Sequence, residues 1–160
     1  MIRTACFAFV AALLAASALA QPPAPTAKPE RPLVSVGFGS DFGIFVETPL
    51  ANPGPQVEAW SWLIRKAPKQ IPGGALYDIT ASRELIQCAN WTRKQLYTDG
   101  FLGDRHLGRD TTGTEPEPIT DGVTKAIANI LCGKTDVSKD APIAEIPAAR
   151  KLVAAHFAAQ

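Results

Sequence analysis

Few residues of this chain could do acid–base or metal chemistry. Its 160 residues include two histidines and three cysteines. A catalytic histidine has to lie within hydrogen-bond reach of the group whose proton it moves. His106 follows Asp104 and Arg105 in a charged run typical of a solvated strand edge, and His156 lies in an alanine-rich stretch that favours a packing role. We therefore predict no catalytic residue and no cofactor. The alternative is an enzyme whose turnover depends on His106.

Residues 1–20 have the pattern of a signal peptide. A basic residue, Arg3, precedes an apolar run that ends in Ala18-Leu19-Ala20, a small-residue cleavage sequence. The alternative is a retained membrane anchor, but the apolar run is short for a span. We predict export to the periplasm or the cell surface, a mature chain that starts at Gln21, and no membrane span in it.

Removal of the signal peptide leaves two cysteines, Cys88 and Cys132. An exported chain with two cysteines predicts one disulfide. With both thiols in that bond, no spacing in the chain resembles a zinc site, so we predict no metal. A disulfide closing a loop of this length contributes roughly 4 kcal/mol in the chain-entropy model.

The charge balance argues against nucleic-acid binding. Removal of Arg3 with the signal lowers the 16 basic residues to 15, which equals the 15 acidic ones. Affinity for nucleic acid comes mainly from clustered Lys and Arg that neutralise phosphates. We therefore predict no nucleic-acid partner.

The first half of the mature chain predicts a linker and three strands. Residues 21–32 contain five prolines and should form a semi-rigid linker outside the fold. Apolar residues then occupy even positions from Val34 to Val46, with a turn at 39–41, as in half-buried strands. A third strand over 57–65 is apolar on both faces. Either helices cover one of its faces, or that face presents an aromatic patch.

The second half predicts three more strands, over 79–88, 91–98 and 101–107. Ala89-Asn90 is a candidate turn between the first two. Asp99-Gly100 is the stronger turn signal, because a tight hairpin needs positive φ and this dipeptide supplies it. Three consecutive antiparallel strands make a meander.

Two helices should follow. Thr120 or Asp121 caps the first, whose apolar stripe contains Val123, Ala126, Ile127, Ile130 and Leu131. A bond from Cys132 requires this helix to unwind there, which Gly133 permits. The second helix begins at Pro147 and either packs on the domain or frays, with one side made of Leu152, Val153, His156 and Phe157.

These elements predict an α+β fold. It consists of an antiparallel meander of about five to six strands, a C-terminal helix packed on one face and one disulfide. The predicted divisions are a signal peptide at 1–20, a Pro-rich linker at 21–32, the main domain at 33–133, and a C-terminal extension with a short helix at 134–160. Open strand edges of such a sheet could pair two copies into a homodimer.

Several motifs of this chain have a characteristic order and spacing. They are Ala59-Trp60-Ser61-Trp62-Leu63, Tyr77-Asp78, Ala81-Ser82 and Glu84 ahead of Cys88, Arg93, Tyr97-Thr98-Asp99-Gly100, Pro118-Ile119, Gly122 and Ala126 to Cys132. This pattern resembles the surface-adhesin protein E family of Gram-negative bacteria. The resemblance implies an antiparallel sheet with a helix on one face, a Cys88–Cys132 bond and export to the envelope. Named members of the family bind host proteins such as vitronectin and laminin, and many others are exported proteins of unknown role.

Together these features predict a non-enzymatic binding module that contacts a protein partner through its sheet face or loops. The alternative is a periplasmic structural or accessory protein without an adhesive role. Exposed aromatic and arginine side chains make strong contacts at interfaces, although aromatics also serve cores and mixed charges also form ordinary surfaces. The candidate partner-binding residues are Trp60, Trp62, Arg83, Trp91, Arg93, Lys94, Tyr97 and Arg105.

Overall fold

The computed structural model describes residues 25–71, 73–120 and 122–160. The predicted signal peptide lies outside these residues, as does the predicted cap Asp121. The chain forms seven strands and two helices in the described part, in the order β1 (Leu33–Phe38), β2 (Phe42–Glu47), β3 (Gln56–Gln70), β4 (Leu76–Gln87), β5 (Thr92–Leu102), β6 (Arg105–Asp110), β7 (Glu117–Pro118), α1 (Gly122–Leu131) and α2 (Ile146–Ala158).

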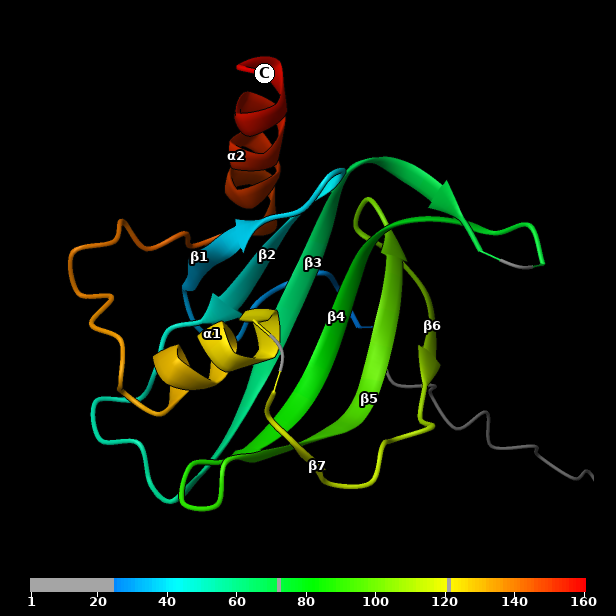
Figure 1. The fold of residues 1–160 in the computed structure, drawn as a ribbon. Coiled ribbons are helices and arrows are strands. Elements are labelled where there is room, and N and C mark those ends of the chain that lie inside the picture. The colour runs from blue at the N-terminus through cyan, green and yellow to red at the C-terminus, as the bar shows by residue number, and fades with distance from the viewer. Residues whose placement is uncertain (1–24, 72, 121) are drawn as a thin grey trace, which may run out of the picture.

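The sheet is the predicted antiparallel meander. Strands β1 to β6 lie side by side in chain order, and each is antiparallel to the next (Figure 1). The two-residue β7 pairs with the start of β5, where Thr92 opposes Pro118. The sequence prediction of fold class, including the single disulfide, is confirmed.

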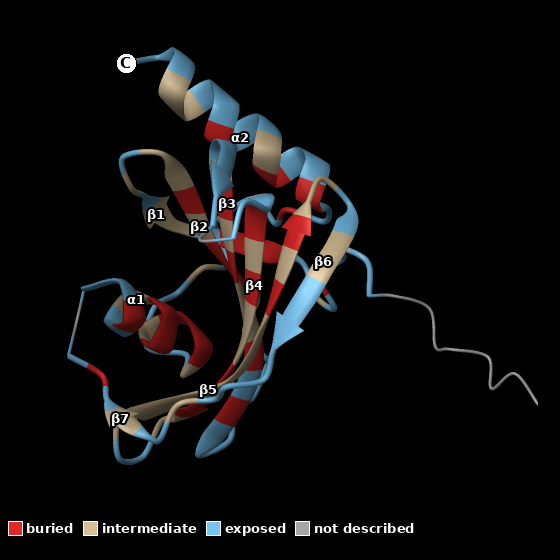
Figure 2. Ribbon diagram, turned by 90° about the vertical axis from the view of Figure 1, so that its right-hand side faces the viewer, coloured by how far each residue is buried: buried red, intermediate tan, exposed pale blue. Residues whose placement is uncertain are grey.

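Each face of the sheet is covered by a different helix. Because side chains alternate along a strand, Trp62 and Ile64 of β3 point to one face, while Val57 and Ala59 point to the other. The first pair belongs to a core built with α2, and the second to a core built with α1. Figure 2 shows the two helices on opposite sides of the sheet. Helix packing therefore explains most of the apolar residues on both faces of the third predicted strand, but Trp60 is only partly buried.

The α1 helix ends where the sequence requires it. Cys132 is bonded to Cys88, with Cα atoms 5.7 Å apart. Gly133 has a φ of 69°, and the amide of Lys134 donates to the carbonyl of Asn129 at 2.8 Å, as in a Schellman cap. Glycine adopts this left-handed conformation readily, because it has no Cβ to clash with the backbone. The cap turns the chain out of the helix and brings Cys132 to the sheet.

The predicted stripe of α1 needs one correction. Val123 is 46% exposed, and Thr124 is buried in its place. The remaining predicted contacts lie toward the sheet, so the stripe begins one residue later than the apolar pattern suggested. The buried residues of this helix are Thr124, Ile127, Ala128, Ile130 and Leu131.

The α2 helix packs on the domain and begins with proline in its first turn, as predicted. Its buried side is formed by Ile146, Ala149 and Val153. Leu152, which the sequence placed on that side, is 43% exposed. The segment before the helix also joins the sheet, because Leu33 and Ile143 exchange backbone hydrogen bonds of 2.8 Å in both directions. Residues 143–153 thus complete one of the two cores.

The predicted turn at Asp99-Gly100 is wrong. Strand β5 continues through both residues to Leu102. The turn lies at Gly103, which has a φ of 61°, and Asp104. The physical reason is that Asp99 is buried within the strand, where its carboxylate accepts hydrogen bonds from side chains of β6.

Strands β3 and β4 are longer than predicted and extend beyond the rest of the sheet as an arm (Figure 1). We define the arm as residues 66–76. Every described residue in it is exposed. Gln70 pairs with Leu76, and the tip turns through Gly73 and Gly74, which have φ values of 100° and 95°.

Residues 25–32, which we call the N-terminal strap, lie against the domain. The strap crosses the sheet on the side away from α1 and is dark blue in Figure 1. The backbone amide of Glu30 donates to Glu47 at 2.8 Å, and the Arg31 guanidinium donates to the same carboxylate at 3.0 Å. Glu47 is fully buried. The prediction that this Pro-rich stretch lies outside the fold is therefore wrong for residues 29–32, because a buried carboxylate needs the donors that the strap supplies.

Candidate binding surface

Three of the predicted partner-binding residues form one row across the sheet. Trp60 opposes Arg83 on the neighbouring strand, and Arg83 opposes Tyr97 on the next. Directly opposed residues on one face lie close enough for their side chains to interact. The Trp60 and Tyr97 ring centroids are 5.4 Å apart, and the Arg83 guanidinium lies 5.4 Å from the Trp60 ring. We call this row, together with Arg109, the aromatic–arginine surface.

The row lies on the α2 side of the sheet, beyond the part that the helix covers. Trp62, Ala81 and Phe101 on the same face are buried in the core with α2. Trp60 is only partly buried and packs against the edge of that core. A β-bulge after Arg83 shifts the register at the end of the row. The surface thus stands on a rigid core while its own side chains reach solvent.

Arg109 joins the surface through a buried carboxylate. Its guanidinium donates to both oxygens of Asp99, at 2.9 and 2.7 Å, and lies 4.0 Å from the Tyr97 ring. His106 Nε2 lies 2.9 Å from Asp99 Oδ1. Burial raises the pKa of Asp99, but the hydrogen bonds from Arg109 and His106 outweigh burial and hold the pKa below its usual value. Asp99 therefore stays ionised and fixes Arg109 beside Tyr97.

The strap contributes one carboxylate to the surface. Trp60 Nε1 donates to Glu30 Oε1 at 3.0 Å, and Arg83 donates to Glu30 Oε2 at 2.9 Å. The hydrogen bond from Trp60 and the charge and hydrogen bond of Arg83 lower the pKa of Glu30. Arg83 also donates to Glu58 at 2.6 Å, so two acids share one guanidinium.

A cavity of about 180 Å³ remains between the strap and the sheet. Its walls combine aromatic rings with one buried carboxylate and two basic groups. The residues that line it include Lys28, Glu30, Trp60, Asp99, Phe101 and Arg109. The strap therefore lies over a partly open groove, and the space beneath it is not filled by side chains.

The other predicted residues do not join this surface. Trp62 is 2% exposed and serves the core. Trp91 packs against the core with α1, and its ring lies 3.7 Å from Lys134 Nζ. Arg93 pairs with Glu117 at 2.7 Å, also on the α1 side of the sheet.

Lys94 and Arg105 lie on β5 and β6, with Lys94 half-buried and Arg105 exposed. Three of the eight predicted residues thus form the row, and the other five lie elsewhere in the molecule. The surface also contains residues that the sequence analysis missed. Glu30 was assigned to the linker, and Asp99 to a turn. Arg109 lies twelve residues after Tyr97, on the next strand of a short hairpin. This spacing was the sequence signal that could have placed Arg109 beside Tyr97.

The structure shows two further features relevant to chemistry. Within the described ranges, no group of three or more His, Cys, Asp or Glu side chains could hold a metal ion. The ring of His106 packs edge-on against Phe101, with centroids 5.3 Å apart, while its Nε2 faces Asp99. This histidine is held as part of an ion-pair cluster around Asp99.

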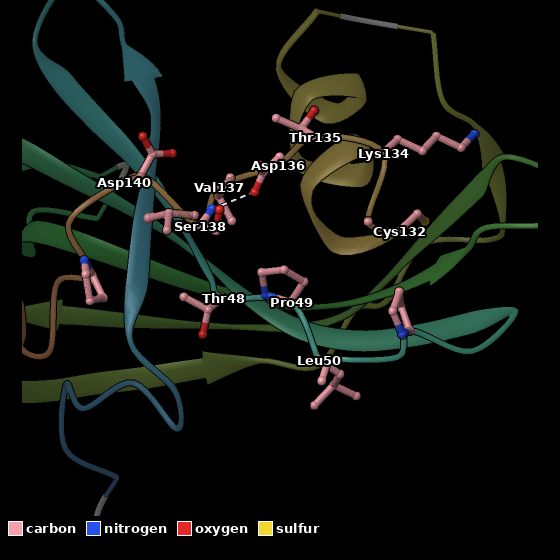
Figure 3. A pocket seen from close by; sticks show the side chains of 15 residues that line it. Thr48, Pro49, Leu50, Cys132, Lys134, Thr135, Asp136, Val137, Ser138 and Asp140 are labelled. Atoms are coloured by element: carbon pink, nitrogen blue, oxygen red, sulfur yellow. Dashed lines mark hydrogen bonds between the residues drawn. The ribbon is translucent and has the colours of Figure 1, made fainter.

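A second hollow lies between two loops near the disulfide (Figure 3). This groove has a volume of about 710 Å³ and is lined by parts of residues 48–53 and 132–142, with Val34 from β1. Leu50 at its rim is 52% exposed. Asp136 accepts the backbone amide of Ser138 at 2.9 Å, so this carboxylate serves its own loop. The groove is mainly apolar and is the candidate for a contact made through loops.

Comparisons with family models, curated proteins and solved structures gave no match. No helix in the described part of the chain is long and apolar enough to cross a membrane. The fold and the surface together define an α+β domain in which a six-strand meander lies between two helices, with a row of aromatic and arginine side chains on one face.

Proposed function

We propose that this chain is an exported, non-enzymatic binding module that contacts a protein partner through the aromatic–arginine surface. The observation that carries the proposal is the cross-strand row of Trp60, Arg83 and Tyr97, with Arg109 over the last ring. Trp, Tyr and Arg are the residues most often responsible for binding energy at protein interfaces. Here they are ordered in advance, so that a partner would not have to immobilise them.

The non-enzymatic part of the proposal is supported by the local surroundings of the histidines. His106 is paired with a buried carboxylate, and His156 stacks on Phe38 with ring centroids 4.0 Å apart. Each ring is thus held in a packing or ion-pair contact. The resemblance to surface-adhesin protein E favours host matrix proteins as partners.

A binding assay with purified mature protein tests this proposal. Vitronectin and laminin are immobilised, and binding is measured by surface plasmon resonance. We expect Trp60→Ala and Arg83→Ala to weaken binding at least about tenfold, as for central interface residues. Arg105→Ala is the control, because Arg105 has the same charge as Arg83 but is an exposed residue that lies off the row. Equal losses in all three variants, or none, would contradict the proposal.

A periplasmic accessory role is the alternative, and protease treatment of intact cells separates the two. The exposed arm and the loop between β6 and β7 are the expected cleavage sites. Cleavage without lysis places the domain outside the cell and supports host contact. Protection until the outer membrane is opened places it in the periplasm and directs the search to envelope partners.

We also propose that a homodimer, if formed, uses the outer edge of β1. Among the described strands, β1 and β6 end the sheet. The edge of β6 carries Arg105, Arg109 and Asp110, and charged residues discourage strand pairing. No residue of β1 is charged, and in the described part of the chain only Leu33 at its start is paired on this edge, with Ile143. Sedimentation of the wild type and of Ser35→Lys tests this, since the lysine should abolish a dimer held by that edge.

A further inference from the structure

The strap contacts the aromatic–arginine surface in the manner of a bound peptide. In the described part of the chain, no residue of the strap belongs to a strand of the sheet. Its contacts with the row are instead made by side chains. Pro29 is buried, Ala27 packs against the core with α2, and the Glu30 carboxylate accepts from Trp60 and Arg83. The intervening Lys28 is exposed.

The chemistry of these contacts is that of peptide recognition. A segment with prolines is extended before binding, so that ordering it costs little entropy, and aromatic-lined grooves recognise such segments. Arg83 and the Trp60 indole N–H together select a carboxylate. The groove therefore matches the pattern small residue, any residue, proline, acidic residue, which is Ala27-Lys28-Pro29-Glu30 in the strap.

The strap is attached at two places, to the buried Glu47 through Arg31 and the Glu30 amide, and to the row through the Glu30 side chain. The contact of Glu30 with the row is the weaker of the two and can be displaced while the contact with Glu47 remains. The Glu30 side chain is 60% exposed, and exposed ion pairs typically change an equilibrium constant by about fivefold or less. A cavity remains beneath the strap, as described above. A tethered segment nevertheless competes at an effective concentration of about millimolar, so an outside ligand has to overcome it.

We propose that the aromatic–arginine surface is a groove for an extended, proline-containing acidic peptide of a partner protein, and that the strap occupies it as an internal competitor. The proposal rests on the proposed function and specifies it further. The partner presents a segment of the same pattern as residues 27–30. The strap lowers the apparent affinity of the groove until it is displaced, because only the open fraction of the protein can bind.

The test uses the full mature protein and a fluorescent peptide with the sequence of residues 25–32, followed by polarisation. Glu30→Ala weakens the strap but leaves the groove intact. We expect the peptide to bind this variant about fivefold more tightly than the wild type. Glu115→Ala is the matched control, since it removes an exposed carboxylate outside the strap and should leave the affinity within twofold. Arg83→Met added to Glu30→Ala should remove the gain.

Four outcomes would overturn the proposal. The peptide could bind Glu30→Ala no more tightly than the wild type, or Arg83→Met could have no effect. Strap exchange between two copies, seen as dimers of Glu30→Ala by sedimentation, would assign the groove to a second copy of this chain. Finally, the protein could fail to bind the peptide and still bind a matrix protein in a way that depends on Trp60. This result would reject the peptide groove but would support the proposed function.

Discussion

The two faces of the sheet are covered in different ways. On one face, the ten-residue helix α1 is tied to β4 through the Cys88–Cys132 bond, just after its last turn. On the other, the thirteen-residue α2 and the strap are held by apolar contacts and ion pairs. A helix of ten residues is marginal without tertiary support, and the covalent bond supplies part of it. The noncovalent face is the one that contains the aromatic–arginine surface.

The largest expected effect comes from removing the covalent tie. Replacement of both Cys88 and Cys132 by serine should lower the free energy of unfolding by roughly 4 kcal/mol, because the bond closes a long loop in the unfolded chain. Urea denaturation followed by circular dichroism measures this. A loss below about 1 kcal/mol would mean that the α1 face needs no covalent tie, and the contrast between the faces would disappear.

The next largest loss of unfolding free energy should come from truncating a side chain in the core under α2. Ile146 is 1% exposed, and Ile146→Ala should lower the free energy of unfolding by about 3 kcal/mol through lost burial and a residual cavity. Leu152→Ala on the same helix is the control and should change stability by less than about 0.5 kcal/mol, because Leu152 is exposed. Similar losses in the two variants would show that α2 packs through a different side.

The ion-pair cluster on the α2 face gives the next effect. Asp99→Asn keeps the shape of the side chain but removes the charge that holds Arg109 and His106. We expect a loss of about 2 kcal/mol in unfolding free energy, typical of hydrogen bonds to a buried charged group. Thermal unfolding at neutral pH measures it. An unchanged melting temperature would mean that the cluster contributes nothing to this face.

The smallest expected effect is that the contact between the strap and Trp60 weakens at low pH. The pKa of Glu30 is lowered in the folded protein, so its contribution is complete above the unfolded pKa and is lost as the pH falls below about 4. Tryptophan emission should therefore change between about pH 5 and pH 3, since Trp60 donates to Glu30. In Glu30→Gln this change should be smaller. An identical titration in the variant would exclude the strap as its source.

Much of the fold could be predicted from the sequence, because the signals involved are local. Alternation from Val34 to Val46 gives the first hairpin, and the spacing of apolar residues before Cys132 gives α1. Gly133 is a C-cap signal that the structure bears out. The disulfide followed from the small number of cysteines. Apart from the disulfide, whose cysteines are 44 residues apart, these predictions depend on residues that are neighbours in the chain.

The rest depended on partners far away in the sequence. Asp99-Gly100 has turn chemistry, but Asp99 is retained in β5 because Arg109 and His106 satisfy it. The strap has linker composition, but the buried Glu47 binds it. In both cases the hydrogen bonds of a buried carboxylate outweigh the local preference of the backbone for a turn or a linker. The donors of these hydrogen bonds cannot be identified from the residues next to the carboxylate in the sequence. The candidate surface was therefore predicted only in part.

The arm formed by β3 and β4 has a practical consequence for studying this protein. Every described residue of the arm is exposed, and its tip turns through Gly73 and Gly74. Exposed loop tips tolerate insertions because no buried backbone is disturbed. A fluorescent reporter or an affinity tag could be spliced into this tip, where it would signal the state of the molecule while both termini stay free.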